Sequence, residues 1–168
     1  MITANALIEK AKTSKFYLNM LNFVLSRVVP FNRPHFFRII SISDNEIKVK
    51  LPYRRANINH LKGIHACALA TLAEFTSGVM LLNLIDNAKY RMLIKNLQVE
   101  YHFQCKTGAL AHFSMSNETF KSTILDPLTI NDSIDLQSEV KIRDRDGNHV
   151  CTGNITWQIK SWEKVKRR

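Results

Sequence analysis

The sequence predicts an α+β domain in which one antiparallel sheet wraps around one long central helix, with an extra helix at the N-terminus. Residues 66–85 (ACALATLAEFTSGVMLLNLI) are apolar almost all the way round a helix, which is typical of a helix that is buried on every side or spans a membrane. The segments on both sides alternate apolar and polar side chains, at the period of two that indicates strands.

The central helix is read as enclosed by the sheet because polar residues interrupt it. Twenty residues of helix are about 30 Å long, enough to span a membrane. However, Glu74, Thr76, Ser77 and Asn83 lie within the run, and no Trp or Tyr belt flanks it. We therefore expect this helix to be the core of a protein in which the sheet supplies the other wall.

The predicted N-terminal helix covers residues 5–28, where apolar residues recur at helical spacing and polar ones lie between them. Pro30 and Pro34 end it. We expect it to pack on its own domain, and the alternative is a helix that rests on a membrane surface. The length of 168 residues fits a single domain, which we divide as follows: helical extension 1–34, core 35–160 and basic tail 161–168.

Six strands are predicted from the alternation of side chains: residues 36–43, 46–51, 93–105, 109–117, 134–143 and 149–160. Asp146-Gly147 is a strong hairpin signal. Val150 falls out of phase, which favours a bulge near Gly153.

Between the fourth and fifth strands, Asp126, Asp132 and Asp135 surround Pro127, and we read them as loop and turn residues.

The composition narrows the classes of partner. A net charge of +10 and a pI near 9.7 suit nucleic acid, an anionic membrane or a polyanionic ligand such as coenzyme A. No aromatic-basic surface motif or recognition helix accompanies the charge, so we expect no nucleic acid. The three cysteines form no CxxC pair and lie in apolar or alternating runs, as buried free thiols of a cytoplasmic protein would. Residues 1–31 do not read as a signal peptide.

Two features of the central helix indicate chemistry. Its first turn, at Ala66 and Cys67, combines small side chains with unpaired backbone N–H groups, which stabilise a carbonyl oxygen that gains negative charge. The alternative is that these small residues merely pack tightly. Glu74 is a carboxylate in an apolar helix, so it faces a cleft with a raised pKa, finds a partner, or points to solvent. A raised pKa suits a general base or a nucleophile.

The pattern of Asn59, His65, Ala66, Cys67 and Glu74 resembles the signature of hotdog-fold thioesterases. It is most similar to the PaaI-like branch (thioesterases of the phenylacetic acid pathway) and to its uncharacterised relatives, domains of unknown function with an N-terminal helix and an HAxAL opening. The resemblance covers roughly residues 35–160.

The resemblance implies a hotdog fold and a homodimer or dimer of dimers, with an acyl-CoA site at the interface and no cofactor. Glu74 would be the base or nucleophile, and the N–H of Ala66 or Cys67 would form the oxyanion hole. His65 and Asn59 would orient the thioester or the attacking water. A set of basic residues is placed near the coenzyme A phosphates by position alone, with a solvated basic face as the alternative: Arg54, Arg55, Lys62, Lys89 and Arg91.

The leading functional hypothesis is therefore acyl-CoA thioester hydrolysis. Lys62 stands at a position where the family usually has Gly, and Cys67 stands at another where Gly is common; both favour a second hypothesis, a non-catalytic protein that binds acyl-CoA or a fatty acid. A third is a peripheral membrane protein that uses residues 5–28 and Lys164–Arg168. No metal-ligand spacing such as HExxH is present, so no metal is expected.

Overall fold

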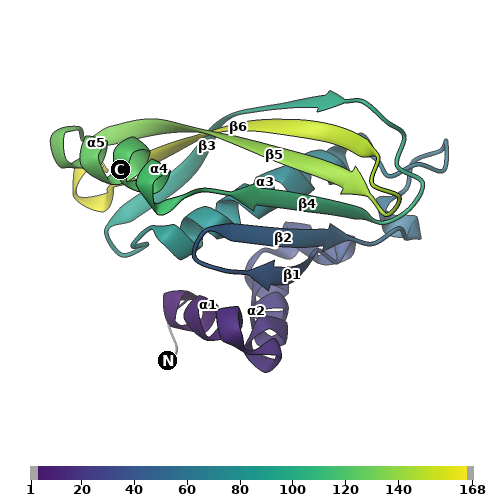
Figure 1. Cartoon of the computed structure of the whole chain (residues 1–168), viewed down its shortest axis with the longest axis horizontal. Coiled ribbons are helices and arrows are strands. Elements are labelled where there is room, and N and C mark those ends of the chain that lie inside the picture. Colours follow the sequence, from purple (N-terminus) through teal and green to yellow (C-terminus); the bar gives the residue numbers. More distant parts are fainter. Residues whose placement is uncertain (1–3, 166–168) are drawn as a thin grey trace.

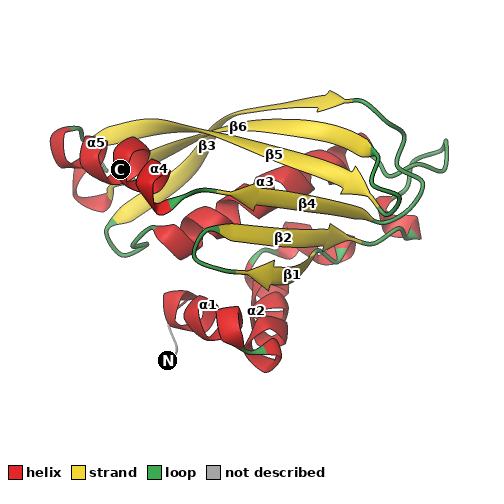
Figure 2. Cartoon of the chain, viewed as in Figure 1, coloured by secondary structure: helices red, strands yellow, loops and turns green. Residues whose placement is uncertain are grey.

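The structure, a computed structural model, describes residues 4–165 as one antiparallel sheet and a long helix that lies across one of its faces (Figures 1 and 2). The six strands follow the order β1-β2-β4-β5-β6-β3, so β1 and β3 are the two edges. Their bounds are β1 Arg38–Ile42, β2 Glu46–Leu51, β3 Tyr90–Tyr101, β4 Ala109–Ser114, β5 Ser133–Asp144 and β6 His149–Ser161. The predicted architecture is confirmed.

The long helix α3 (Ala66–Leu84) packs its apolar surface against the sheet. It is long and apolar enough to cross a membrane, the one such helix among the described residues, but burial in the core accounts for its composition. The side chains at its centre and those of the strands below have no exposed area: Leu72, Ala73, Met80 and Leu81 of α3, and Ile47, Val49 and Leu51 of β2.

Two glycines set how closely α3 approaches the sheet. A Cβ atom added to Gly153 of β6 would lie 2.6 Å from the Cβ of Ala73, and one added to Gly78 of α3 would lie 3.1 Å from the Trp157 ring. The indole Nε1 of Trp157 donates a hydrogen bond of 3.1 Å to the Ser77 hydroxyl. At this point the Ala73 side chain of α3 and the Trp157 ring of β6 each pack directly against the backbone of a glycine on the other element.

The N-terminal extension is two helices, so the single helix predicted over residues 5–28 is wrong at one position. The helices α1 (Ala4–Thr13) and α2 (Lys15–Val28) are separated at Ser14, whose backbone is extended. The helical spacing of apolar residues continues through Ser14, so the sequence pattern does not reveal the break. Ser14 is the N-cap of α2, a position at which Ser is common. A short 3-10 helix, η1 (Pro30–His35), follows α2.

Helix α2 covers the β1 edge through one side chain. The Asn22 side-chain oxygen accepts a hydrogen bond of 2.8 Å from the Ile39 N–H, and its amide nitrogen donates one of 3.0 Å to the Ile39 carbonyl. Asn22 thus takes the place of a neighbouring strand for this residue, and Figure 1 shows α2 beside β1. The β1 edge is partly closed in this way.

The segment between β4 and β5 is helical, contrary to the loop read around Pro127. It comprises α4 (Asn117–Phe120), a π-helical turn (Lys121–Leu125) and α5 (Asp126–Ile130), and the fully buried Ile124 anchors it. Pro127 lies in the first turn of α5, where a helix does not need its N–H.

The predicted bulge also lies elsewhere. Ile142 pairs with Cys151 and Arg143 pairs with His149, so Val150 itself is the extra residue. Gly153 is instead the point of contact with α3.

Replacing Gly153 with Ala should lower the free energy of unfolding by about 1–3 kcal/mol, because the new methyl group must displace α3. Urea denaturation measures it. Gly108→Ala is the control, since the nearest atom to a Cβ there is 3.4 Å away, an ordinary contact. Equal stability of Gly153→Ala and the wild type would contradict the close approach.

Candidate functional site

The loop before α3 is organised by Asn57, which the sequence analysis missed. Its side chain is fully buried; the amide nitrogen donates to the carbonyls of His35 and Pro52, and the oxygen lies 3.0 Å from the His35 ring nitrogen Nδ1. The Asn57 carbonyl also accepts a hydrogen bond of 2.7 Å from the His65 N–H. Asn57 therefore ties the start of α3 to the segment before β1, and no spacing in the sequence marks it.

Asn59 shapes the turn that leads to the helix. Its side-chain oxygen accepts hydrogen bonds from the N–H groups of Leu61 (2.9 Å) and Gly63 (3.1 Å). Lys62, within this turn, has a φ of 61°, in the left-handed region that residues other than Gly seldom adopt. The Asn59 oxygen is thus used by the loop, and its amide group remains as a donor.

His65 is the N-cap of α3, and this changes the prediction for Cys67. The His65 Nδ1 accepts a hydrogen bond of 3.1 Å from the Cys67 N–H, so that N–H is not free to bind a ligand oxygen. The Ala66 N–H has no hydrogen-bond partner within residues 4–165. Of the two predicted oxyanion donors, Ala66 is the free one. Cys67 also has an exposed thiol, contrary to the expectation that all three cysteines are buried.

Glu74 is a mostly buried carboxylate without a partner. Its side chain makes no hydrogen bond or ion pair with any residue that the structure describes, and burial raises its pKa above the usual value of 4.5. One of its oxygens lies 3.9 Å from the position of a Cβ built on Gly78, beside the Trp157 ring. Of the alternatives for Glu74, the structure therefore favours the desolvated carboxylate over the paired or solvated one.

The start of α3 and the end of β3 together form an open hollow of about 460 Å³. The Tyr101 hydroxyl, at the end of β3, donates a hydrogen bond of 2.9 Å to the Ala66 carbonyl and closes one side. Asn59 and Ala66 both line this hollow. Glu74 does not, since it lies eight residues further along α3, about 12 Å along the helix axis. Within one chain, the free amide and the carboxylate are separate.

The five basic residues predicted near coenzyme A fall into two groups. Arg54, Arg55 and Lys62 lie exposed in the segment before α3, where the Arg54 guanidinium stacks 3.9 Å above the Phe36 ring. Lys89 and Arg91 flank the start of β3, roughly 33 Å of strand away from Tyr101. One chain does not bring the two groups together.

The family model for a domain of unknown function, DUF4442, matches residues 19–159. The chain belongs to the DUF4442 family. Its fold is the hotdog fold, which it shares with solved structures of low sequence identity. None of the curated proteins matches the chain in sequence.

Two bacterial structures illustrate the likeness. PA5026 from Pseudomonas aeruginosa, described as a protein of unknown function and probable thioesterase, has a TM-score of 0.77 at 19% identity, covering 85% of this chain and 95% of its own. Thioesterase HI1161 from Haemophilus influenzae has a TM-score of 0.70 at 10% identity, covering 94% of this chain and 99% of its own. At these identities the likeness concerns the fold of this DUF4442 protein.

The buried charge of Glu74 predicts a pH-dependent stability. An unfolded Glu ionises at its usual pKa and the folded one only at a higher pKa, so stability falls as the pH rises through this interval. Glu74→Gln removes this pH-dependent contribution to the free energy of unfolding. Its free energy of unfolding should exceed that of the wild type at neutral pH, and the difference should shrink below the usual Glu pKa.

Urea denaturation across this pH range tests the sign. The exposed Glu139, paired with Lys141 at the surface, supplies the control Glu139→Gln, which should show no such trend. A stabilisation by Glu74→Gln that is independent of pH would refute the assignment.

Proposed function

We propose that this DUF4442 protein binds acyl-CoA thioesters and hydrolyses them at sites formed by two copies of the chain, as the resemblance to PaaI-like thioesterases implies. The observation that carries the proposal is the unpartnered Glu74, whose pKa is raised by burial, on the same helix that opens with the free amide of Ala66. A desolvated carboxylate suits a base, and a free amide at a helix N-terminus suits an oxyanion.

In the proposed reaction Glu74 takes a proton from water as the water oxygen attacks the thioester carbonyl carbon. The carbonyl oxygen becomes negatively charged and accepts a hydrogen bond from the Ala66 N–H. The carbon–sulfur bond then breaks, the acyl group leaves as a carboxylic acid, and the coenzyme A thiolate takes up the proton. Asn59 and His65 are positioning residues: the first shapes the loop before the helix, and the second holds its first turn.

The separation of about 12 Å between the Ala66 amide and Glu74 supports a site made by two chains. A two-fold axis beside Ala70, midway between Ala66 and Glu74, sets two such helices antiparallel and brings Glu74 of one chain towards the first turn of the other. The same axis sets two β3 strands antiparallel, so Lys89 and Arg91 of one chain lie near Arg54, Arg55 and Lys62 of the other. Both groups then serve one coenzyme A.

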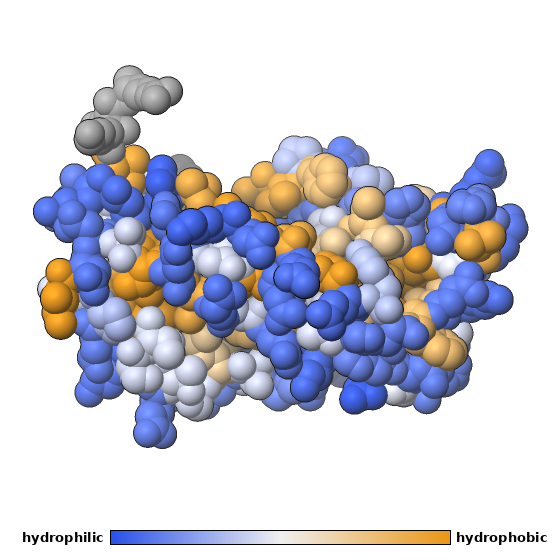
Figure 3. Space-filling view, turned by 90° about the horizontal axis from the view of Figure 1, so that it is seen from above, coloured by the Kyte–Doolittle hydropathy of each residue, from blue (hydrophilic) through white to orange (hydrophobic). Residues whose placement is uncertain are grey.

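The β3 edge has the surface that such a dimer needs. Ile94, Leu97 and Tyr101 point to the helix side of the sheet, as their partners on β6 show, yet they are 41%, 37% and 49% exposed. Figure 3, which views the molecule from the side of β3 in Figure 1, shows hydrophobic side chains in a band along this face. An uncovered apolar edge of this kind favours burial against a second copy.

Glu74→Gln should lower the rate of acyl-CoA hydrolysis about 100-fold or more, because the amide cannot accept the proton. A panel of short and long acyl-CoA substrates, with thiol release as the readout, measures it, and Glu139→Gln is the charge-matched control. Equally slow turnover by the wild type and Glu74→Gln over the whole panel would refute catalysis by Glu74.

One observation favours a second function, binding of acyl-CoA or a fatty acid without turnover. The Cys67 N–H is taken by His65, which leaves the Ala66 N–H as the one free oxyanion donor of the predicted pair. Calorimetry that finds tight acyl-CoA binding by a protein without hydrolytic activity would establish this alternative.

Leu97→Lys should weaken the proposed dimer by about 2 kcal/mol or more, as loss of a central interface residue does. Light scattering over a dilution series measures the association. Asn96→Lys places the same charge on the opposite face of β3 and should leave the dimer intact. A monomeric wild type, or equal effects of the two variants, would contradict an interface on the helix side of β3.

A further inference from the structure

A second cavity lies at the opposite edge of the sheet from β3, between α2, η1, β1 and α3, with a volume of about 350 Å³. It shares no lining residue with the hollow at the start of α3. Its size is at the lower end of the range of about 300–1,000 Å³ that is typical of small-molecule sites. It belongs to none of the machinery proposed for thioester hydrolysis.

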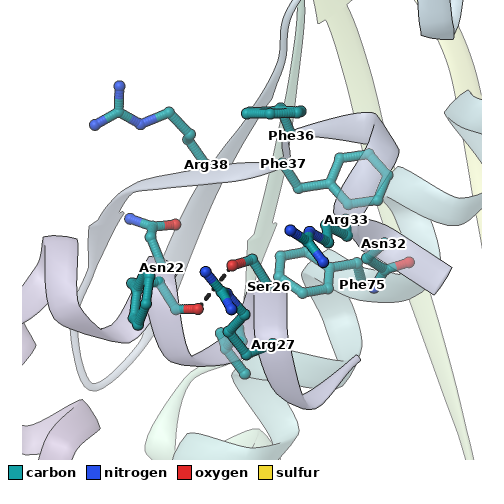
Figure 4. A pocket seen from close by; sticks show the side chains of 11 residues that line it. Asn22, Ser26, Arg27, Asn32, Arg33, Phe36, Phe37, Arg38 and Phe75 are labelled. Carbon is teal, nitrogen blue, oxygen red and sulfur yellow. Dashed lines mark hydrogen bonds between the residues drawn. The ribbon is translucent and has the colours of Figure 1, made fainter. Parts of the chain in front are cut away.

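The cavity is apolar inside and basic at its rim. Leu25, Phe37 and Phe75 contribute apolar walls, and the Phe37 and Phe75 rings stack with their centroids 5.4 Å apart. Arg33 of η1 lies beside the Phe75 ring (Figure 4), and the Arg27 guanidinium of α2 lies 4.9 Å from the centre of the Phe23 ring, which also lines the cavity. No acidic residue lines the cavity, and neither arginine forms an ion pair within residues 4–165.

Two further features distinguish the cavity wall: a buried polar atom without a partner and a strained backbone. Asn32 lines the cavity at 7% exposure, and its Oδ1 atom has no hydrogen-bond donor in the described chain. Phe36, also in the wall, has a φ of 57°, an uncommon conformation for an aromatic residue, and its ring is covered by Arg54. Unsatisfied polar groups and backbone strain of this kind gather at binding sites.

We propose that this cavity binds a single-chain amphiphile with an anionic head group, a medium-length fatty carboxylate. The guanidinium groups of Arg27 and Arg33 hold the carboxylate, since their planar donors match its two oxygens. The aliphatic chain lies against Leu25, Phe37 and Phe75. The small volume selects chains of medium length over long ones.

Calorimetric titration of the full chain with octanoate, below its micelle concentration, tests the site. One equivalent should bind saturably. The double variant Arg27→Gln/Arg33→Gln should weaken binding about tenfold or more, through loss of the charge-assisted hydrogen bonds. The control Lys121→Gln/Arg145→Gln removes the same charge from exposed positions outside the cavity and should leave affinity unchanged. The double variant Arg27→Gln/Arg33→Gln should hydrolyse acyl-CoA at the wild-type rate, which separates this site from the thioester site.

Three other ligands identify the recognised chemistry. Octanamide, which has a chain and no charge, and acetate, which has a charge and no chain, should both bind much more weakly than octanoate. Octanamide binding as tight as octanoate would overturn the anionic subsite. Equal losses in the two double variants, or no octanoate binding, would overturn the cavity itself. Binding only to vesicles that contain phosphatidylglycerol would identify a membrane surface instead, formed by the exposed side chains of Phe16, Phe23 and Val28 on α2.

Discussion

The burial of α3 against β6 is the constraint on which the other features of this protein depend. A helix that is apolar on all sides has to be enclosed, and here the sheet reaches it closely enough that Gly153 and Ala73 have no room for a larger side chain. The contact also sets the position of the helix along its axis, because Trp157 lies over Gly78 and bonds to Ser77. The position of α3 in turn fixes the position of its first turn and the extent to which Glu74 is buried.

Several polar groups around α3 complete the fold, and the Glu74 carboxylate does not. Asn57 and His65 satisfy donors and acceptors at the start of the helix, and the Tyr101 hydroxyl joins that turn to β3. Glu74 has no such partner among the residues that the structure describes, so its burial opposes folding. The proposed role of Glu74 as a base would account for a buried carboxylate that weakens the fold.

The long periodic elements were predictable from the sequence, and the local exceptions were not. The strand Glu46–Leu51 agrees in both bounds and α3 ends one residue before the predicted end, because burial on a defined face leaves a regular pattern. The break at Ser14 and the helices at residues 117–130 leave no such pattern, since tertiary contacts decide them.

The same division holds within the candidate site. The loop at Asn59 and the helix start at Ala66 do lie together, as their closeness in sequence suggests. Three features of the site depend on side-chain directions, which sequence spacing does not encode. The Cys67 N–H bonds to His65, the Cys67 thiol is exposed, and Asn57 holds the loop. The separation between Ala66 and Glu74 follows from the rise of a helix and could be predicted. The proposal that two chains form the site also needs the exposed apolar edge of β3, which the sequence alone did not reveal.

The two edges of the sheet differ, and Asn22 is the reason. By bonding to the N–H and the carbonyl of Ile39, it occupies hydrogen-bonding positions that another strand would need on β1, whereas no strand within residues 4–165 pairs with the outer side of β3. A sheet with one partly closed edge and one open edge offers β3 as its main edge for strand addition, and the pairing proposed for two copies would use that edge up in both. Assembly by strand addition would then stop at a pair and not continue into a filament. In such an assembly, the Asn22 side chain is the group that limits growth at the other edge.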